Sequence, residues 1–303
     1  MVLQKLSDKP HQNSYDVVIV GGAMLGSSVA WFLSSNPDFN GTILVVEKDP
    51  TYEFSSTAHT NSCMRQQFST AINIKISQFG ADFVKNFRTY MGGDERVPDV
   101  PFQTFGYMYL ADTVEFANAL KQAQALQHDL GAATKHMTPD QIKRDYPFYM
   151  LDDIIAGNHN LIDEGYFDGN TLFDWWKRSA RERGVEYIRN EVVDVHCNTL
   201  GSRVDTVSLK SGEQIACGTV VNASGPRAAV TARMAGIELP VEPRKRYTFM
   251  FDAEHRLDRE LPLTVDPAAV HVRIAGDVYM AVLPPELSQP GEVEDCAEAQ
   301  RHW

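Results

Sequence analysis

Apolar runs and helical segments alternate along the first fifty positions of the chain. Val17–Val20 is a short β-branched run, typical of a strand that is buried on both faces. The glycine-rich stretch GGAMLG follows at 21–26, and Ser27–Leu33 has the composition of a helix. Thr42–Val46 is a second apolar run, which ends at Glu47. Strand, turn, helix and strand within roughly 30 residues predict a βαβ unit with parallel strands.

Apolar positions three and four residues apart predict the longer helices. In Thr70–Tyr90 these positions are Ile72, Ile76, Phe79, Phe83 and Phe87. Thr113–Leu130 and Asp168–Arg183 are further predicted helices, and Thr138 followed by proline caps a short one. Shorter runs predict strands at Gly106–Leu110, Val185–Ile188, Val192–Val195, Thr206–Leu209, Gln214–Cys217, Thr219–Ala223 and Arg246–Asp252. Strands that alternate with helices indicate an α/β fold.

Charge and composition exclude several classes of protein. The 303 residues carry a formal net charge of -12, which disfavours a nucleic-acid or anionic-membrane partner because the field of the chain repels phosphate. Residues 1–15 are polar and lack a secretory signal, and no apolar run is long enough to span a bilayer. The cysteines, Cys63, Cys197, Cys217 and Cys296, are scattered and lack metal-ligand spacing. We therefore expect a cytoplasmic protein without a metal site or membrane span.

The stretch GGAMLG matches the dinucleotide-binding pattern G-x-G-x-x-G except at its middle glycine. Gly21 makes the turn, Gly26 lets the helix pack close to the strand, and Gly22 adds flexibility beside Ala23, whose methyl group is a small intrusion. We expect a pyrophosphate at the helix N-terminus, where free N–H groups and the helix dipole favour an anion. Glu47, 21 residues after Gly26, is placed to bind ribose hydroxyls and disfavours NADP. A tight turn with a surface glutamate is the alternative, and the turn alone does not distinguish FAD from NAD.

Five stretches together resemble the D-amino-acid oxidase / sarcosine oxidase superfamily of FAD-dependent oxidoreductases. They are DVVIVGGAMLGSSVAWFL at 16–33, SSTAHTNSCMRQQFST at 55–70, DEGYFDG at 163–169, VVNASGP at 220–226 and LPVEPRKRYTF at 239–249. The resemblance implies FAD as the cofactor. It also implies a Rossmann-like FAD-binding domain of the glutathione-reductase type with a second, sheet-based substrate domain. The expected FAD-binding domain is discontinuous, at 14–90 and 150–235, and the expected substrate domain takes 91–149 and 236–303.

The same resemblance implies the contacts to the adenosine and pyrophosphate parts of FAD. They are Gly21, Gly22, Ala23 and Gly26 at the pyrophosphate, Glu47 at the ribose, Lys48 toward the adenine, Ser56 and Thr57 along the pyrophosphate, Val193 at the adenine, and Ala223 and Gly225 at a second close approach. For Val193, Ala223 and Gly225 the alternative is plain packing within a sheet.

Near the flavin ring the resemblance implies Arg65, Gln66 and Gln67. A positive charge at Arg65 would stabilise the anionic reduced flavin, and a surface salt bridge is the alternative. His59 matches the spacing of related dehydrogenases that carry the flavin on a histidine, or it is a polar residue near the flavin. Arg273 is expected to bind a substrate carboxylate as a bidentate fork, so Arg65 and Arg273 are the candidate catalytic residues. Aromatic candidates for the substrate side, or else packing residues, are Tyr107, Tyr109, Tyr247, Phe249 and Tyr279.

The resemblance implies an oxidoreductase that oxidises the C–N bond of an amino acid or a secondary (N-methyl) amine, with hydride transfer to flavin N5. The family's last part has no match after Val282, which indicates either a C-terminally shortened member or a truncated or frameshifted gene. The edge left by this loss would favour aggregation or pairing with a partner chain. One alternative is a weakly active or inactive flavoprotein that assists assembly of a partner complex. This assembly role is implied by the resemblance to the branch of the family that includes a mitochondrial complex I assembly oxidoreductase. The second alternative is an NAD-dependent dehydrogenase.

Overall fold

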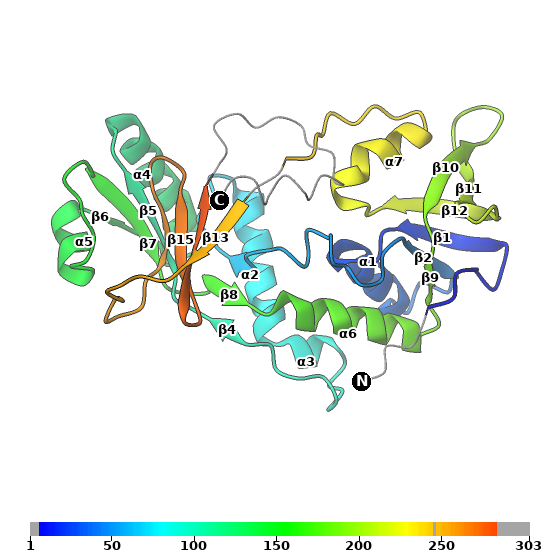
Figure 1. Cartoon of the computed structure of the whole chain (residues 1–303), viewed down its shortest axis with the longest axis horizontal. Helices are drawn as coiled ribbons and strands as arrows, with labels where there is room; N and C mark the ends of the chain where they lie inside the picture. Colours follow the sequence, from blue (N-terminus) through cyan, green and yellow to red (C-terminus); the bar gives the residue numbers. More distant parts are fainter. Residues whose placement is uncertain (1–5, 245–246, 284–303) are drawn as a thin grey trace. The chain divides into compact units, whose positions relative to one another are not determined.

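The chain forms two compact units in a computed structural model that describes residues 6–244 and 247–283 (Figure 1). Residues up to Thr60 and from Gly169 to Arg244 make the first unit, and the second contains the segment from Asn61 to Asp168. Strands from the region after residue 246 complete the second unit.

These units divide the chain differently from the expected domains. Residues 61–90 and 150–168, expected with the FAD-binding segments, belong to the second compact unit. The assignment of one domain to the cofactor and the other to the substrate stays a prediction. The acidic sequence after Pro284, including Cys296, lies outside the described residues.

A six-stranded sheet forms the centre of the first unit, in the order β10-β11-β12-β1-β2-β9. Its strands are β1 (Ser14–Val20), β2 (Ile43–Glu47), β9 (Glu186–Arg189), β10 (Val192–Cys197), β11 (Val204–Leu209) and β12 (Gln214–Asn222). β12, β1, β2 and β9 run parallel, which confirms the predicted βαβ unit. The two strands predicted at 214–223 are one strand, because β12 pairs antiparallel with β11 at its start and parallel with β1 along its length.

Helices cover this sheet, and α6 packs against α1. The helices of the unit are α1 (Met24–Ser35), α6 (Gly169–Glu182), the 3-10 helix η1 (Gly225–Arg227) and α7 (Ala228–Met234). Leu172, Trp176 and Ala180 are buried, which confirms the predicted apolar face of α6. The apolar residues of β1 and β2 are buried on both faces, as the β-branched runs predict.

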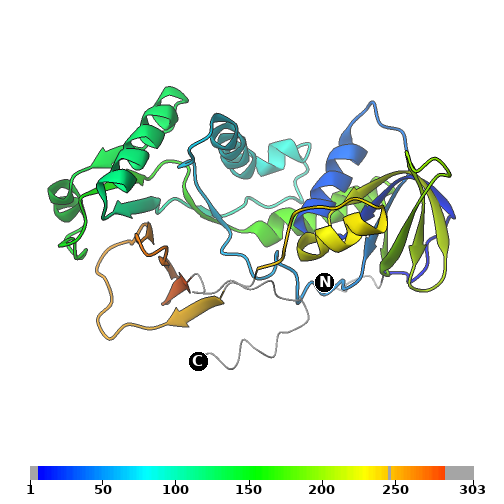
Figure 2. The same ribbon diagram turned by 90° about the horizontal axis from the view of Figure 1, so that it is seen from above.

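The second unit contains a seven-stranded sheet in the order β13-β16-β15-β14-β5-β7-β6 and a three-stranded sheet in the order β3-β8-β4. The strands are β3 (Cys63–Met64), β4 (Phe102–Gln103), β5 (Tyr107–Ala111), β6 (Lys135–Met137), β7 (Ala156–Asn160), β8 (Gly165–Phe167), β13 (Tyr247–Phe251), β14 (Leu263–Val265), β15 (His271–Ala275) and β16 (Val278–Leu283). The helices are α2 (Ala71–Lys85), α3 (Phe87–Tyr90), α4 (Val114–Asp129) and α5 (Pro139–Asp145). Helix α4 packs on β5, β6 and β7 (Figure 2). Thr138 caps α5 with a full capping box, as predicted.

Helix α2 corrects the prediction of a single helix at 70–90. The helix stops at Asn86, whose φ of -110° and ψ of 26° are not helical, and α3 starts at the next residue. The expected apolar face was wrong at three positions, because Ile72, Ile76 and Phe79 are 63%, 59% and 52% exposed, whereas Ile74 is fully buried. Its last two positions, Phe83 and Phe87, are buried as predicted. The helix carries two apolar stripes, and packing within the unit buries the one that includes Ile74, Ala81 and Val84.

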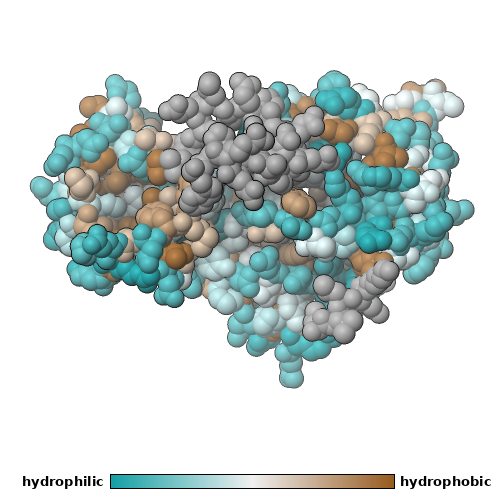
Figure 3. Space-filling view, viewed as in Figure 1, coloured by the Kyte–Doolittle hydropathy of each residue, from teal (hydrophilic) through white to brown (hydrophobic). Residues whose placement is uncertain are grey.

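Hydrophilic residues dominate the visible face of the described residues, and hydrophobic residues occur among them in small groups (Figure 3). No helix in the described part of the chain is long and apolar enough to cross a bilayer.

Candidate functional site

The glycine turn between β1 and α1 leaves no space for side chains at its two outer positions. Gly21 has a φ of 97°, and a Cβ there would lie 2.4 Å from the Ala223 carbonyl oxygen. A Cβ at Gly26 would lie 1.8 Å from the Gly21 carbonyl oxygen, because the helix starts directly against the turn. The two outer glycines are therefore required by backbone packing, independently of any ligand.

The middle of the turn is held by side chains and leaves the start of α1 open. The Gly22 N–H donates to Glu47 Oε2 at 2.7 Å, and the Gly22 carbonyl accepts from Ser27 Oγ at 2.7 Å. Ala23 is the N-cap of α1 and makes no side-chain cap bond, because its methyl group has no acceptor. Among the residues that the structure describes, Thr57 reaches the first turn, where its Oγ1 accepts from the Met24 N–H at 3.3 Å. A helix start with few acceptors fits an anionic group.

Glu47 is buried at the end of β2, so the alternative of a surface glutamate is excluded. Its side chain is 8% exposed, and its second oxygen accepts from the Asp49 N–H at 2.8 Å. Burial raises the pKa of the carboxyl, while the hydrogen bonds and the Lys177 charge lower it. The neighbouring Lys48 side chain is exposed. A buried carboxylate beside the glycine turn fits the hydroxyl donors of a ribose.

The remaining candidates of the first unit lie on its surface. Ser56 and His59 are exposed, and His59 Nε2 lies 2.6 Å from the Glu53 carbonyl oxygen. Val193 is 44% exposed and has no partner in the β10–β11 register, where a bulge separates its two neighbours. A bulge frees the main-chain groups of its extra residue, which fits the expected backbone contact to an adenine.

Ala223 and Gly225 follow the end of β12. The Ala223 N–H donates to the Val20 carbonyl at 2.9 Å, so this segment continues the pairing with β1. Gly225 has a φ of 58°, and a Cβ there would meet nothing within 4 Å. Gly225 is thus required by its left-handed backbone and not by a close neighbour within the described residues.

In the second unit, Arg65, Gln66 and Gln67 form a turn that is tied to one buried acid. The Gln66 N–H donates to Glu164 Oε1 at 2.7 Å, and Gln67 Nε2 donates to Glu164 Oε2 at 2.9 Å. The Arg65 guanidinium lies 4.5 Å from the centroid of the Phe68 ring, and its buried Nε has no hydrogen-bond partner in the described part of the chain. Arg65 is therefore held by aromatic contact and not by a surface salt bridge, which was the alternative.

The sequence reasoning missed Glu164 as a site residue. Its side chain is fully buried, and burial raises its pKa to about 7 even though hydrogen bonds from Gln66 and Gln67 oppose the shift. Glu164 also holds the start of β5, since its carbonyl accepts from the Gly106 N–H at 3.0 Å. Its only signal in the sequence was its place in DEGYFDG, a stretch quoted for the resemblance alone.

Arg273 shares one face of the seven-stranded sheet with Tyr107 and Tyr109. Val265 pairs with both Tyr109 and His271, and Arg273 is two residues after His271 on β15. The Arg273 side chain is 6% exposed and lies 5.2 Å from the centroid of the Tyr166 ring. Its Nη1 and Nη2 donate to the carbonyls of Ile274 and Asn61 at 3.0 and 3.3 Å, and its Nε has no hydrogen-bond partner within residues 6–244 and 247–283.

The sheet separates the five aromatic candidates. Tyr279 pairs with Ile274, the residue next to Arg273, so it lies on the opposite face, where it packs in a core with Met108. Phe249 pairs with Ala281, two residues from Tyr279, and Tyr247 is two residues from Phe249, so both share that opposite face. The expectation that all five line one substrate side was wrong, because side chains alternate between the faces of a strand.

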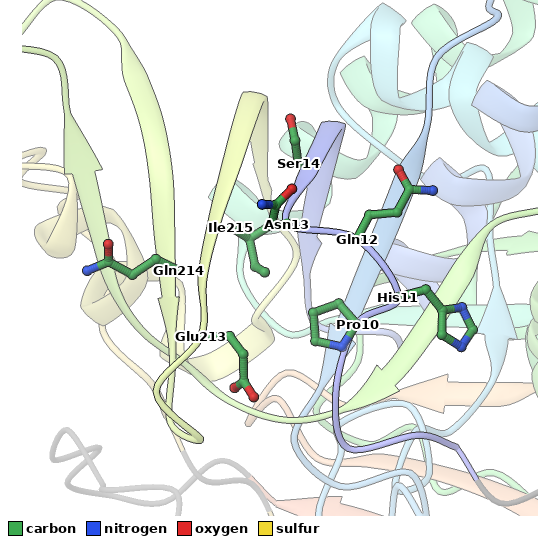
Figure 4. A pocket seen from close by; sticks show the side chains of 8 residues that line it. All are labelled: Pro10, His11, Gln12, Asn13, Ser14, Glu213, Gln214 and Ile215. Carbon is green, nitrogen blue, oxygen red and sulfur yellow. The ribbon is translucent and has the colours of Figure 1, made fainter.

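A hollow of about 590 Å³ lies at the start of β1, at the other end of this strand from Gly21 (Figure 4). Its lining residues are Pro10, His11, Gln12, Asn13, Ser14, Glu213, Gln214 and Ile215. The acid in it is already paired, because Lys9 lies 3.0 Å from Glu213. No predicted site residue lines this hollow.

The comparison with protein families agrees with the glycine turn and the buried acid at the end of β2. The family described as FAD dependent oxidoreductase (DAO) matches residues 16–287. The chain belongs to this family. FAD is therefore the cofactor. The open start of α1 and the buried Glu47 fit its adenosine diphosphate half.

Individual relatives in the family show how much of each protein the chain matches. It is 30% identical to FAD-dependent oxidoreductase domain-containing protein 1 of Xenopus laevis, over 91% of this chain and 62% of that protein. It is 26% identical to sarcosine oxidase subunit beta of an Arthrobacter species, over 76% of this chain and 56% of that protein. The chain thus spans less than two thirds of the length of these curated relatives.

A solved structure of similar fold supports the α/β architecture. The L-proline dehydrogenase from P. horikoshii superposes with a TM-score of 0.73 over 99% of this chain and 76% of that chain, at 21% sequence identity. This likeness confirms the predicted fold class of a Rossmann-like FAD-binding fold with additional sheet structure.

Proposed function

We propose that this member of the FAD-dependent oxidoreductase family oxidises the C–N bond of an amino acid or a secondary (N-methyl) amine. Bound FAD would supply the hydride acceptor, flavin N5. The matched sarcosine oxidase subunit beta supports a substrate of this class, because its name refers to an N-methyl amino acid.

The observation that carries the proposal is Arg273. A guanidinium has five N–H donors, and two of those of Arg273 are used by main-chain carbonyls. Among residues 6–244 and 247–283, no carboxylate lies within ion-pair distance of it, although its side chain is almost fully buried. A buried cation without an anion costs folding free energy, and a substrate carboxylate would supply the missing charge.

Arg65 is proposed to act at the flavin ring. Its charge already acts on the sheet face of Arg273. Burial raises the pKa of Tyr109 and the Arg65 charge opposes this rise. For His271, burial lowers the pKa and the Arg65 charge lowers it further. A cation at this face would favour an anionic reduced flavin, as the family resemblance implies. Glu164 would hold the turn that carries Arg65, because its two carboxylate oxygens accept hydrogen bonds from Gln66 and Gln67.

The test is anaerobic reduction of the FAD-loaded full chain, followed by flavin absorbance. Each amino acid and N-methyl amino acid is compared with its decarboxylated amine, for example sarcosine with dimethylamine. We expect bleaching only by the acids. Arg273→Met should raise the concentration for half-maximal reduction roughly 10- to 100-fold, as loss of a charged hydrogen bond predicts. Arg259→Met, which removes a half-exposed arginine of the same unit, is the matched control.

Three outcomes separate the alternatives. If every carboxylate-bearing amine bleaches the flavin but Arg273→Met behaves like Arg259→Met, the reaction stands and the role of Arg273 is wrong. If the flavin stays oxidised with every amine, the amine oxidation is wrong and the alternative of an inactive assembly flavoprotein is favoured. Reduction by a nicotinamide cofactor without bound flavin would favour the dehydrogenase alternative.

A further inference from the structure

Tyr52 reaches the glycine turn from a loop that the sequence motif does not include. It lies after β2 with a φ of 58°, a left-handed conformation that is unusual for a tyrosine, and its side chain is 7% exposed. Its hydroxyl donates to the Gly22 carbonyl at 3.2 Å. Its ring meets the Phe173 ring of α6 edge to face, with centroids 4.7 Å apart.

The bond from Tyr52 determines the direction of one peptide group. Ser27 Oγ and the Tyr52 hydroxyl both donate to the Gly22 carbonyl, so this carbonyl points into the unit. In a trans peptide the carbonyl and the following N–H point in opposite directions. The Ala23 N–H therefore points outward at the start of α1, where an anion is favoured.

Lys177 of α6 places a cation on the Tyr52 ring. Its Nζ lies 4.7 Å from the centroid of Tyr52 and 4.8 Å from that of Phe173, and its side chain is 18% exposed. The nearest acid, Asp174, is 3.9 Å away. The charge of Lys177 also favours the ionised form of the buried Glu47, since it lowers the pKa of that carboxyl against burial.

We propose that Tyr52 and Lys177 are positioning residues for FAD: the Tyr52 hydroxyl orients the Gly22–Ala23 peptide toward the pyrophosphate, and the Lys177 cation holds the Tyr52 ring in place beside Phe173. The proposal rests on the cofactor of the family and not on amine oxidation. It explains why a tyrosine is held in a left-handed backbone, and why a partly buried lysine lies beside two aromatic rings.

The first measurement is the dissociation constant of FAD by quenching of flavin fluorescence, without any amine. Tyr52→Phe keeps the ring and loses the hydroxyl, and we expect roughly fivefold weaker binding, as one hydrogen bond predicts. Tyr15→Phe is the matched control: it removes a buried hydroxyl bonded to Glu186, which lies away from the turn. Thermal unfolding of the apo chains should be alike for the two variants. An FAD affinity of Tyr52→Phe within twofold of Tyr15→Phe would overturn the role of Tyr52.

The second measurement is the dissociation constant of FAD for Lys177→Met and Lys177→Arg, again without any amine. Lys177→Met loses the cation on the Tyr52 and Phe173 rings, and we expect roughly threefold weaker binding, as one cation–π contact predicts. Lys177→Arg retains a cation over the rings and should restore the wild-type affinity. An FAD affinity of Lys177→Met equal to that of the wild type would overturn the role of Lys177.

Discussion

The glycine turn of the first unit and the Arg273 face of the second are built in opposite ways. The turn is made of main chain: Gly21 and Gly26 are in contact with carbonyl oxygens, and the open N–H groups of α1 supply the polarity. The Arg273 face is made of side chains from segments that are far apart in the sequence, with Cys63 on β3 packed against the cluster that contains Tyr107 on β5. Space limits which side chains the first region accepts, and the cost of buried charge limits which side chains the second region accepts.

This difference determines which substitutions each region tolerates. In the turn, one methyl group in the wrong place collides with backbone that has nowhere to move. On the Arg273 face, shape is less critical than the balance of charge between Arg65, Arg273 and Glu164. Arg273 and Glu164 are both buried there. Three substitutions break or sharpen the contrast.

The largest effect is expected for Gly26→Ala. Its new methyl group would lie 1.8 Å from the Gly21 carbonyl, so the helix must move away from the strand. We expect a loss of about 3 kcal/mol in the free energy of unfolding, measured by urea titration.

Gly212→Ala is the control for this substitution. Gly212 has a φ of 100° but a Cβ there would meet nothing within 4 Å, so only the backbone preference is lost, at about 1 kcal/mol. Equal losses for the two variants would show that the turn is not limited by space.

An intermediate effect is expected for Glu164→Gln, through the pH dependence of stability. Burial raises the pKa of Glu164 to about 7, above its ordinary 4.5. Between these pH values the folded chain holds a proton that the unfolded chain has released, so this group lowers stability as pH rises through the window. The slope approaches about 1.4 kcal/mol per pH unit for one proton.

Urea titrations between pH 5 and 8 measure this slope. Glu164→Gln should remove it, since glutamine does not titrate, and Glu254→Gln at an exposed position should retain it. A variant at Glu164 with the wild-type slope would show that the charge balance of the Arg273 face does not involve this acid.

The smallest effect is expected for His59→Ala. His59 is exposed and its ring contacts only the carbonyl of Glu53 among the bonds described, so the free energy of unfolding should change by less than about 0.5 kcal/mol. Acid precipitation of the FAD-loaded wild type and of the variant should leave the flavin in both supernatants. Colour that stays with the wild-type precipitate and not with His59→Ala would establish covalent attachment at this residue.

Much of the first unit could be predicted because its signals are local. The β-branched runs of β1 and β2, the apolar face of α6 and the spacing from Gly26 to Glu47 are properties of neighbouring residues. The second unit was harder to predict. β7 reads AGNHN and has no apolar pattern, yet all five residues are buried because partners elsewhere satisfy them. Asn158, for example, donates to the Leu120 carbonyl at 2.8 Å.

The candidate site divides in the same way. The glycines and Glu47 were predicted from spacing, whereas Tyr52, Glu164 and Lys177 were not, because a single polar residue carries no periodic signal. The aromatic candidates Tyr107 and Tyr279 could not be separated without the register of the sheet.

The sequence by itself determined the parallel βαβ unit, the glycine turn and the acid at its end, because backbone sterics and short-range periodicity act between residues that are close in the chain. Only the tertiary structure decided that Ile72 is exposed and Ile74 buried, that Glu164 holds the turn of Arg65, and that the Tyr52 hydroxyl bonds to Gly22 while Lys177 lies on the Tyr52 ring. These depend on which distant segments pack together, and burial and charge act through that packing.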